Sequence, residues 1–141
     1  MTTQRSARTK GSQFELECRD SLLPVFHDIQ RYGGEGFVSQ VDLVSREHKV
    51  AVECKRWKDL GVNHWTKLCE LYAKLVEKSS TMNYAPDEFY LLFKPNRSPC
   101  LVMFMDADFQ FTVKEFTTHF GVPFLDRKKK VKANDIELQK M

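Results

Sequence analysis

Residues 50–55, with the sequence VAVECK, constrain the fold more than any other segment of the chain. The segment begins with the β-branched and small apolar residues of a buried strand, but it ends with Glu53 and Lys55. Because side chains alternate along a strand, these two charged side chains share one face. A carboxylate beside an ammonium group at the rim of a core has a desolvation cost unless a further group compensates it. A divalent metal ion and a phosphate are the obvious candidates.

The turn before this strand determines which residue faces Glu53. If the turn has four residues, Ser45 pairs with Val50 and Asp42 lies opposite Glu53, with Cβ atoms about 4.5–5.5 Å apart. Lys55 then lies on the same face, whereas a slip of one residue would turn the two acids apart. The residues predicted to enter the core from the other face are Val41, Leu43, Val52 and Cys54.

Two opposed carboxylates suit one kind of ligand. They repel each other unless they are neutralised, and their oxygen atoms are preferred ligands of Mg²⁺ and Mn²⁺. A metal ion held there would lower the pKa of a water molecule and polarise a phosphorus centre. Lys55 could then orient the attacking water or stabilise the charge of the transition state. The alternative is a cross-strand ladder of charged surface residues without catalytic function.

The composition indicates one globular domain. The chain has 141 residues, of which 42% are hydrophobic and 29% charged, enough to bury a core. No apolar run approaches the roughly 18 residues of a membrane span, and the polar N-terminus lacks the apolar region of a secretion signal. The cysteines have no paired spacing, which argues against zinc and disulfides and favours an intracellular setting. They are Cys18, Cys54, Cys69 and Cys100.

Hydrophobic periodicity predicts an α/β (α+β) domain with the order α-β-β-α-β-β-α. We expect a flexible basic arm over residues 1–10, the domain over 11–125 and a basic charged tail over 126–141. The first helix is predicted to start at Ser12, which forms a capping box with Glu15. The other predicted elements are strands at 37–45 and 50–57, a helix at 62–78, strands at 89–94 and 101–105, and a helix at 112–120.

Basic residues gather at both ends of the chain and around the central strand. The net charge is only +3, but clusters of this kind are typical of a surface that binds a polyanion. Solvated tails on an ordinary domain explain the charges equally well. The clustered residues are Arg5, Arg8 and Lys10; Lys49, Lys55, Arg56 and Lys58; and Arg127, Lys128, Lys129, Lys130 and Lys132.

The order of these acidic and basic residues resembles the PD-(D/E)xK nuclease superfamily, in which Asp42 and then Glu53-Cys54-Lys55 would form the motif. More narrowly, residues 10–15 (KGSQFE), 41–44 (VDLV) and 52–55 (VECK) are similar to archaeal-type Holliday junction resolvases, found in archaea, their viruses and some phages. The similarity covers roughly residues 10–58. It implies a restriction-endonuclease-like fold, with a central mixed β-sheet flanked by helices.

The resemblance also implies the roles of individual residues. The catalytic set would be Glu15, Asp42, Glu53 and Lys55, with Mg²⁺ as the cofactor and Mn²⁺ as a substitute. The metal would be held by Asp42, Glu53, Glu15 and the backbone carbonyl of Cys54. For Glu15 the capping box is a second, purely structural explanation. DNA contacts are expected from Arg8, Lys10, Ser39, Arg56 and Lys58.

The resulting hypothesis is a metal-dependent DNA endonuclease, specifically a Holliday junction resolvase that cuts four-way junctions as a homodimer. The protein would act in the cytoplasm or at the nucleoid, or in the host cell of a virus or phage. One alternative is another nuclease of the superfamily, acting in restriction or repair, or on flaps or duplex DNA. The other is a catalytically inactive nucleic-acid-binding module on the same fold.

Overall fold

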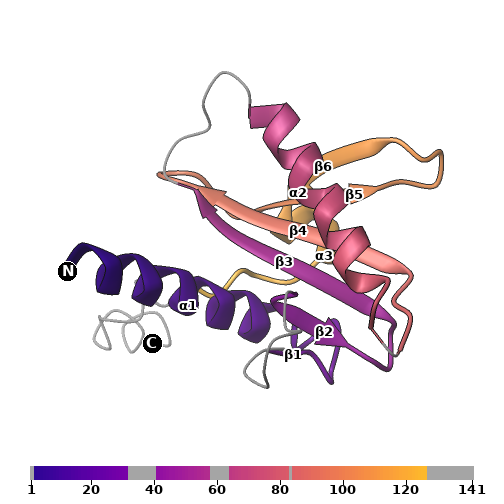
Figure 1. Cartoon of the computed structure of the whole chain (residues 1–141), viewed down its shortest axis with the longest axis horizontal. Helices are drawn as coiled ribbons and strands as arrows, with labels where there is room; N and C mark the ends of the chain where they lie inside the picture. Colours follow the sequence, from indigo (N-terminus) through magenta and orange to yellow (C-terminus); the bar gives the residue numbers. More distant parts are fainter. Residues whose placement is uncertain (1, 32–40, 58–63, 83, 127–141) are drawn as a thin grey trace, which may run out of the picture.

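The computed structural model of the chain describes residues 2–31, 41–57, 64–82 and 84–126, of which 2–10 by their backbone alone (Figure 1). Within these ranges, three helices and six strands follow one another along the chain. They are α1 (Thr2–Leu22), β1 (Gln30–Arg31), β2 (Leu43–Ser45), β3 (Val50–Trp57), α2 (His64–Ser79), β4 (Glu88–Pro95), β5 (Leu101–Met105), β6 (Phe111–Glu115) and α3 (Phe116–Phe120).

The strands form one mixed sheet whose spatial order is the order of the sequence, β1-β2-β3-β4-β5-β6. β3 and β4 are parallel, and the other neighbouring pairs are antiparallel. A parallel pair needs a crossover connection, which α2 supplies. The predicted mixed sheet flanked by helices is therefore confirmed at this level.

The two long helices lie on opposite faces of the sheet (Figure 1). Alternation along β3 directs Val50 and Val52 towards α1, and Ala51 towards α2. Both faces of the central strands are buried, which explains their nearly continuous apolar sequences. The cluster under α1 contains Phe14, Cys18, Leu22, Leu43, Val50, Val52 and Leu92, and those under α2 contain Leu68, Tyr72, Leu75, Val41, Val44, Ala51, Leu91, Phe93 and Met103.

The predicted element order is wrong in two places, because it lacks β1 and β6. β1 has only two residues, too few to give a periodic pattern. The predicted helix at 112–120 is instead the edge strand β6 followed by the short helix α3. Phe111 and Val113 alternate into the cluster under α2, and this period of two prevails over the helical pattern. The helix end at Gly121 is confirmed by its left-handed φ of 71°.

The predicted helix start at Ser12 is also wrong, because α1 begins at Thr2. The backbone of residues 2–10, predicted as a flexible arm, forms the first turns of this helix. No proline interrupts the segment, and Gly11 inside a helix costs only about 1 kcal/mol relative to alanine. The predicted tail from residue 127 onwards lies outside the described residues. No helix among those that the structure describes is long and apolar enough to cross a membrane.

Candidate metal centre

The predicted register of the β2–β3 hairpin is confirmed. Ser45 pairs with Val50 across a four-residue turn, and Leu43 pairs with Val52. Asp42 immediately precedes β2, and its Oδ2 accepts a hydrogen bond from the Cys54 N–H at 2.8 Å. This hydrogen bond keeps the Asp42 carboxylate beside the backbone of β3.

The predicted core residues of the hairpin separate into two groups. Leu43, Val52 and Cys54 face α1, as the alternation requires. Val41 is buried as predicted, but it joins the cluster with Leu75 of α2, so its predicted face is wrong. The reason is that residue 41 precedes the first paired residue of β2, so that no ladder enforces alternation there.

Three carboxyl groups from separate elements lie in a row, with that of Asp42 in the middle. The side chains of Glu15 from α1 and Glu53 of β3 both lie close enough to the Asp42 carboxyl group to interact with it. Glu15 also pairs with Arg31 of β1, whose guanidinium lies 3.2 Å from Oε2. The same guanidinium donates a hydrogen bond to Ser12 Oγ at 3.3 Å. Because α1 begins at Thr2, Ser12 lies inside the helix and does not cap it, so the structural explanation for Glu15 is wrong.

Burial and mutual repulsion dominate the electrostatics of these acids. Desolvation, together with the contact with Glu53 and its charge, raises the pKa of Asp42 from 3.8 to about 7. Desolvation and the contact with Asp42 raise the pKa of Glu15 to about 7, against the opposing effect of Arg31. Arg31 offsets only part of this cost, so a further cation would favour ionisation of both Asp42 and Glu15. Their oxygen atoms suit a hard divalent ion such as Mg²⁺, so that the donor set fits this cofactor.

Lys78, which sequence reasoning does not identify, lies beside Glu53 at the other end of this row of acids. Lys78, in the last turn of α2, places its Nζ 3.3 Å from Oε2 of Glu53. Arg31 was missed as well. Both residues reach the acids only through the packing of separate elements, and no local pattern marks either of them. Alternation along the strands predicts which side chains of one hairpin share a face. It does not predict which side chains of other elements pack against that face.

The remaining motif residues differ in exposure. Lys55 is exposed, and alternation along β3 puts it on the face of Glu53. The Cys54 side chain enters the core, where burial raises the pKa of its thiol to about 12, so that it stays protonated. The backbone of Cys54 contacts the acids directly, through the hydrogen bond from its N–H to Asp42.

Of the residues predicted to bind DNA, Arg56 alone has a described side chain. Its Nη1 donates a hydrogen bond to the Lys94 carbonyl of β4 at 2.7 Å, and alternation puts it on the face opposite to Lys55. Ser39 and Lys58 lie outside the described residues. Arg8 and Lys10 lie in α1, where the structure describes the backbone only.

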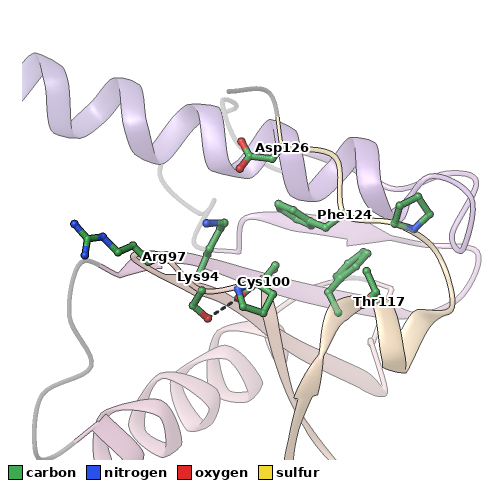
Figure 2. A pocket seen from close by; sticks show the side chains of 10 residues that line it. Lys94, Arg97, Cys100, Thr117, Phe124 and Asp126 are labelled. Atoms are coloured by element: carbon green, nitrogen blue, oxygen red, sulfur yellow. Dashed lines mark hydrogen bonds between the residues drawn. The ribbon is translucent and has the colours of Figure 1, made fainter. Parts of the chain in front are cut away.

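A cavity of about 640 Å³ lies between the end of β4, the β4–β5 turn and the start of α3 (Figure 2). Its wall combines the basic side chains of Lys94 and Arg97 with Phe116, Phe124 and Asp126. None of the three acids of the candidate metal centre lines it, so that the cavity is a separate feature.

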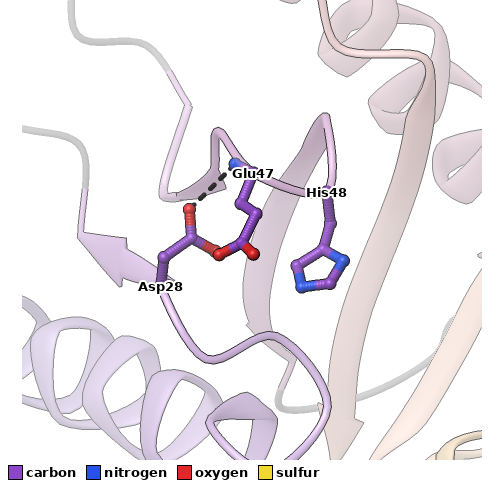
Figure 3. Close-up of side chains that lie close together, drawn as sticks. All are labelled: Asp28, Glu47 and His48. Carbon is purple, nitrogen blue, oxygen red and sulfur yellow. Dashed lines mark hydrogen bonds between the residues drawn. The ribbon is translucent and has the colours of Figure 1, made fainter.

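Asp28, Glu47 and His48 form a second group of possible metal ligands near the β2–β3 turn (Figure 3). Asp28 has a structural role there, because it accepts hydrogen bonds from the Glu47 N–H at 2.9 Å and from the Ser45 hydroxyl. Although desolvation opposes the effect, these bonds lower the pKa of Asp28 below its usual value. Asp28 thus holds the turn whose length sets the register of the hairpin.

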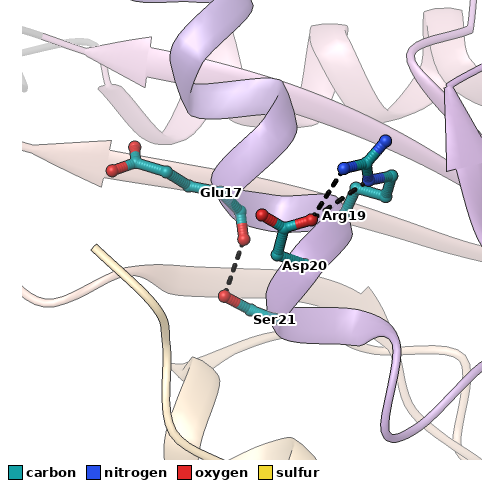
Figure 4. Close-up of polar contacts among 4 residues, drawn as sticks. All are labelled: Glu17, Arg19, Asp20 and Ser21. Atoms are coloured by element: carbon teal, nitrogen blue, oxygen red, sulfur yellow. Dashed lines mark hydrogen bonds and ion pairs between the residues drawn. The ribbon is translucent and has the colours of Figure 1, made fainter. Parts of the chain in front are cut away.

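The other polar groups near the end of α1 serve the fold (Figure 4). Arg19 pairs with Asp20 at 2.9 Å. The Ser21 hydroxyl donates to the Glu17 carbonyl at 2.7 Å and accepts from the Leu125 N–H at 2.8 Å. The second bond ties the segment after α3 to α1, which holds the helix that carries Glu15.

Comparison of the chain with protein-family models, curated proteins and solved structures gives no match. The candidate metal centre is therefore defined by the three converging carboxyl groups and their two basic partners.

Proposed function

We propose that this protein is a metal-dependent DNA endonuclease with a restriction-endonuclease-like fold. The observation that carries the proposal is the convergence of Glu15, Asp42 and Glu53 from α1, the start of β2 and β3. Two of these acids have pKa values raised to about 7, which is unfavourable for a site that serves stability alone. The cost is explained if the acids evolved to hold Mg²⁺, with Mn²⁺ as a substitute.

Each residue has a distinct part in the proposed reaction. Asp42 and Glu53 hold the metal, and Glu15 supports it from α1. When bound, Mg²⁺ polarises the phosphodiester and lowers the pKa of the attacking water. Lys55 has the exposure needed to meet DNA, and its ammonium group stabilises the charge that develops on the phosphate oxygens. The backbone carbonyl of Cys54 is the remaining proposed ligand.

The element order supports the proposed fold family. A helix precedes an antiparallel hairpin, and a helical crossover then leads to the parallel strand β4. The acids lie on this hairpin and on the helix before it, as the resemblance of residues 10–58 to junction resolvases implies.

The proposed substrate is a four-way DNA junction. Two strands of a junction must be cut, and a two-fold homodimer offers two equivalent active sites for this purpose. Arg8, Lys10, Ser39 and Lys58 are proposed to contact the phosphate backbone, which positions DNA without reading its sequence. Related nucleases prefer flaps, nicks or linear duplex, so that the substrate has to be tested directly.

The test compares purified wild-type protein on labelled four-way, flap, nicked and linear DNA during a Mg²⁺ titration. We expect paired symmetric nicks in the four-way junction that require Mg²⁺. Asp42→Asn should abolish cleavage and leave junction binding intact, and Lys55→Ala should do the same. Glu70→Gln is the matched control, because it removes an exposed carboxylate of α2 that belongs to neither group of possible metal ligands.

Each alternative has its own result in this assay. Undiminished Mg²⁺-dependent cutting by Asp42→Asn protein would refute the proposed active site. Preferred cutting of flaps or linear duplex would instead assign the protein to another class of nuclease. Binding of DNA with no Mg²⁺-dependent product would identify a non-catalytic module.

A further inference from the structure

Glu15 and Glu53, the two acids on either side of Asp42, each have a cationic partner from a different element. Arg31 pairs with Glu15, and Lys78 pairs with Glu53. The second pair is the more buried, with side chains of Lys78 and Glu53 that are 29% and 13% exposed. The corresponding values for Arg31 and Glu15 are 42% and 21%. Lys78 is therefore the less solvated counter-ion of the two.

The position of Lys78 is fixed by the packing of α2. Leu75, one turn earlier, is fully buried against Val44 and Ala51 of the hairpin. The next residue, Ser79, is buried and donates its hydroxyl to the Leu75 carbonyl at 2.7 Å. The Thr81 hydroxyl donates to the carbonyl of Lys78 itself at 2.8 Å. A well-anchored helix end therefore holds the ammonium group over β3.

We propose that Lys78 is a positioning residue that occupies Glu53 in the metal-free protein and competes there with the divalent metal. This inference rests on the proposed metal-binding function. An ammonium nitrogen 3.3 Å from Glu53 Oε2 stands where a second cation would approach the same carboxylate. Two cations at such a short separation repel each other strongly outside bulk water. Binding of the metal therefore requires Lys78 to withdraw from Glu53, and this displacement weakens metal affinity.

The position of Lys78 at a helix end also has a simpler explanation. A lysine in the last turn of a helix interacts favourably with the helix dipole whatever lies opposite to it. That explanation predicts a loss of stability on removal of Lys78 and no change in metal affinity. Competition predicts instead that the protein binds the metal more tightly once the ammonium group of Lys78 is gone.

The experiment measures Mn²⁺ binding by the full chain, from the electron paramagnetic resonance signal of free Mn²⁺. We expect Lys78→Met to bind Mn²⁺ about tenfold more tightly than the wild type, equivalent to about 1.4 kcal/mol. Lys78→Arg keeps the competing charge and should stay within about twofold of the wild type. Lys67→Met, which removes an exposed charge from the start of α2, controls for the change in net charge.

The possible outcomes separate this inference from the proposed function. Unchanged or weaker Mn²⁺ binding by folded Lys78→Met protein would overturn the competition. Circular dichroism verifies the fold, and Lys78→Gln provides a second neutral variant if the Met variant unfolds. A wild-type protein that binds no Mn²⁺ would overturn the metal centre itself, and the competition with it.

Discussion

Replacement of Asp42 by asparagine should stabilise the metal-free protein at alkaline pH. In the folded state, burial and the neighbouring Glu53 raise the pKa of Asp42 from 3.8 to about 7. A carboxyl group with a raised pKa binds its proton more tightly in the folded than in the unfolded state. Its contribution to stability is therefore greatest below about pH 4 and is lost as the pH rises towards 7.

The size of this loss follows from the same pKa difference. At about 1.36 kcal/mol per pH unit, the rise from 3.8 to about 7 corresponds to an upper limit of about 4 kcal/mol. Asparagine avoids the loss because it does not ionise, and its Oδ1 can still accept the hydrogen bond from the Cys54 N–H. The new amide group, however, needs a partner of its own. We therefore expect a gain of about 2 kcal/mol at pH 8, within that limit.

Urea unfolding in the presence of EDTA, followed by tryptophan fluorescence, would measure the effect. The free energies of unfolding of the wild type and of Asp42→Asn should be similar near pH 4 and diverge by about 2 kcal/mol near pH 8. Comparison of the two proteins cancels the titration of shared groups that Asp42 does not influence; Glu15 is an exception, because Asp42 contributes to its raised pKa. A variant that is equally or less stable at both pH values would refute the claim that an uncompensated charge on Asp42 strains the metal-free fold.

Three further predictions concern the metal, the turn and a helix end. Mg²⁺ at 100 times its Kd should stabilise the wild type by about 2.7 kcal/mol in a thermal-shift assay at pH 8, and Asp42→Asn should abolish this gain. Asp28→Ala removes the acceptor that holds the β2–β3 turn and should cost about 1–2 kcal/mol in urea unfolding, whereas Glu47→Ala, which retains the backbone donor, should cost far less. Gly121→Ala should cost about 1 kcal/mol in the same assay, because the φ of 71° strains any residue with a Cβ although the space around it is open.

The hairpin was predictable from sequence because one local quantity determines it. Turn length sets the register, and a period of two then decides which side chains share a face. Local sequence alone therefore predicts that Asp42 and Glu53 lie close together. It does not reveal Asp28, which holds the turn from outside the hairpin. Asp28 lies 17 residues before Ser45, whose hydroxyl donates a hydrogen bond to it.

Sequence reasoning was less successful wherever packing between elements decides the outcome. Residues 111–115 alternate in polarity as β6, but a helical pattern also fits the segment 112–120, and the edge of the sheet decides between them. The start of α1 was misplaced because Ser12 and Glu15 satisfy a local capping rule that the structure does not use. The partnership of Lys78 with Glu53 depends on how α2 lies on the sheet, and no spacing in the sequence encodes it.

The loss of the capping explanation changes the meaning of Glu15. A capping glutamate would lie at a helix start and turn back to its own backbone. Here Glu15 lies in the interior of a helix that begins at Thr2, and its carboxyl group is directed to Arg31 and Asp42 instead. Burial and the contact with Asp42 make its charge costly, and the pairing with Arg31 offsets only part of that cost. A residue that serves the fold alone would avoid such a contact between acids. A shared proton or a bound cation would relieve this contact between acids, and the Mn²⁺ and Mg²⁺ experiments distinguish the two.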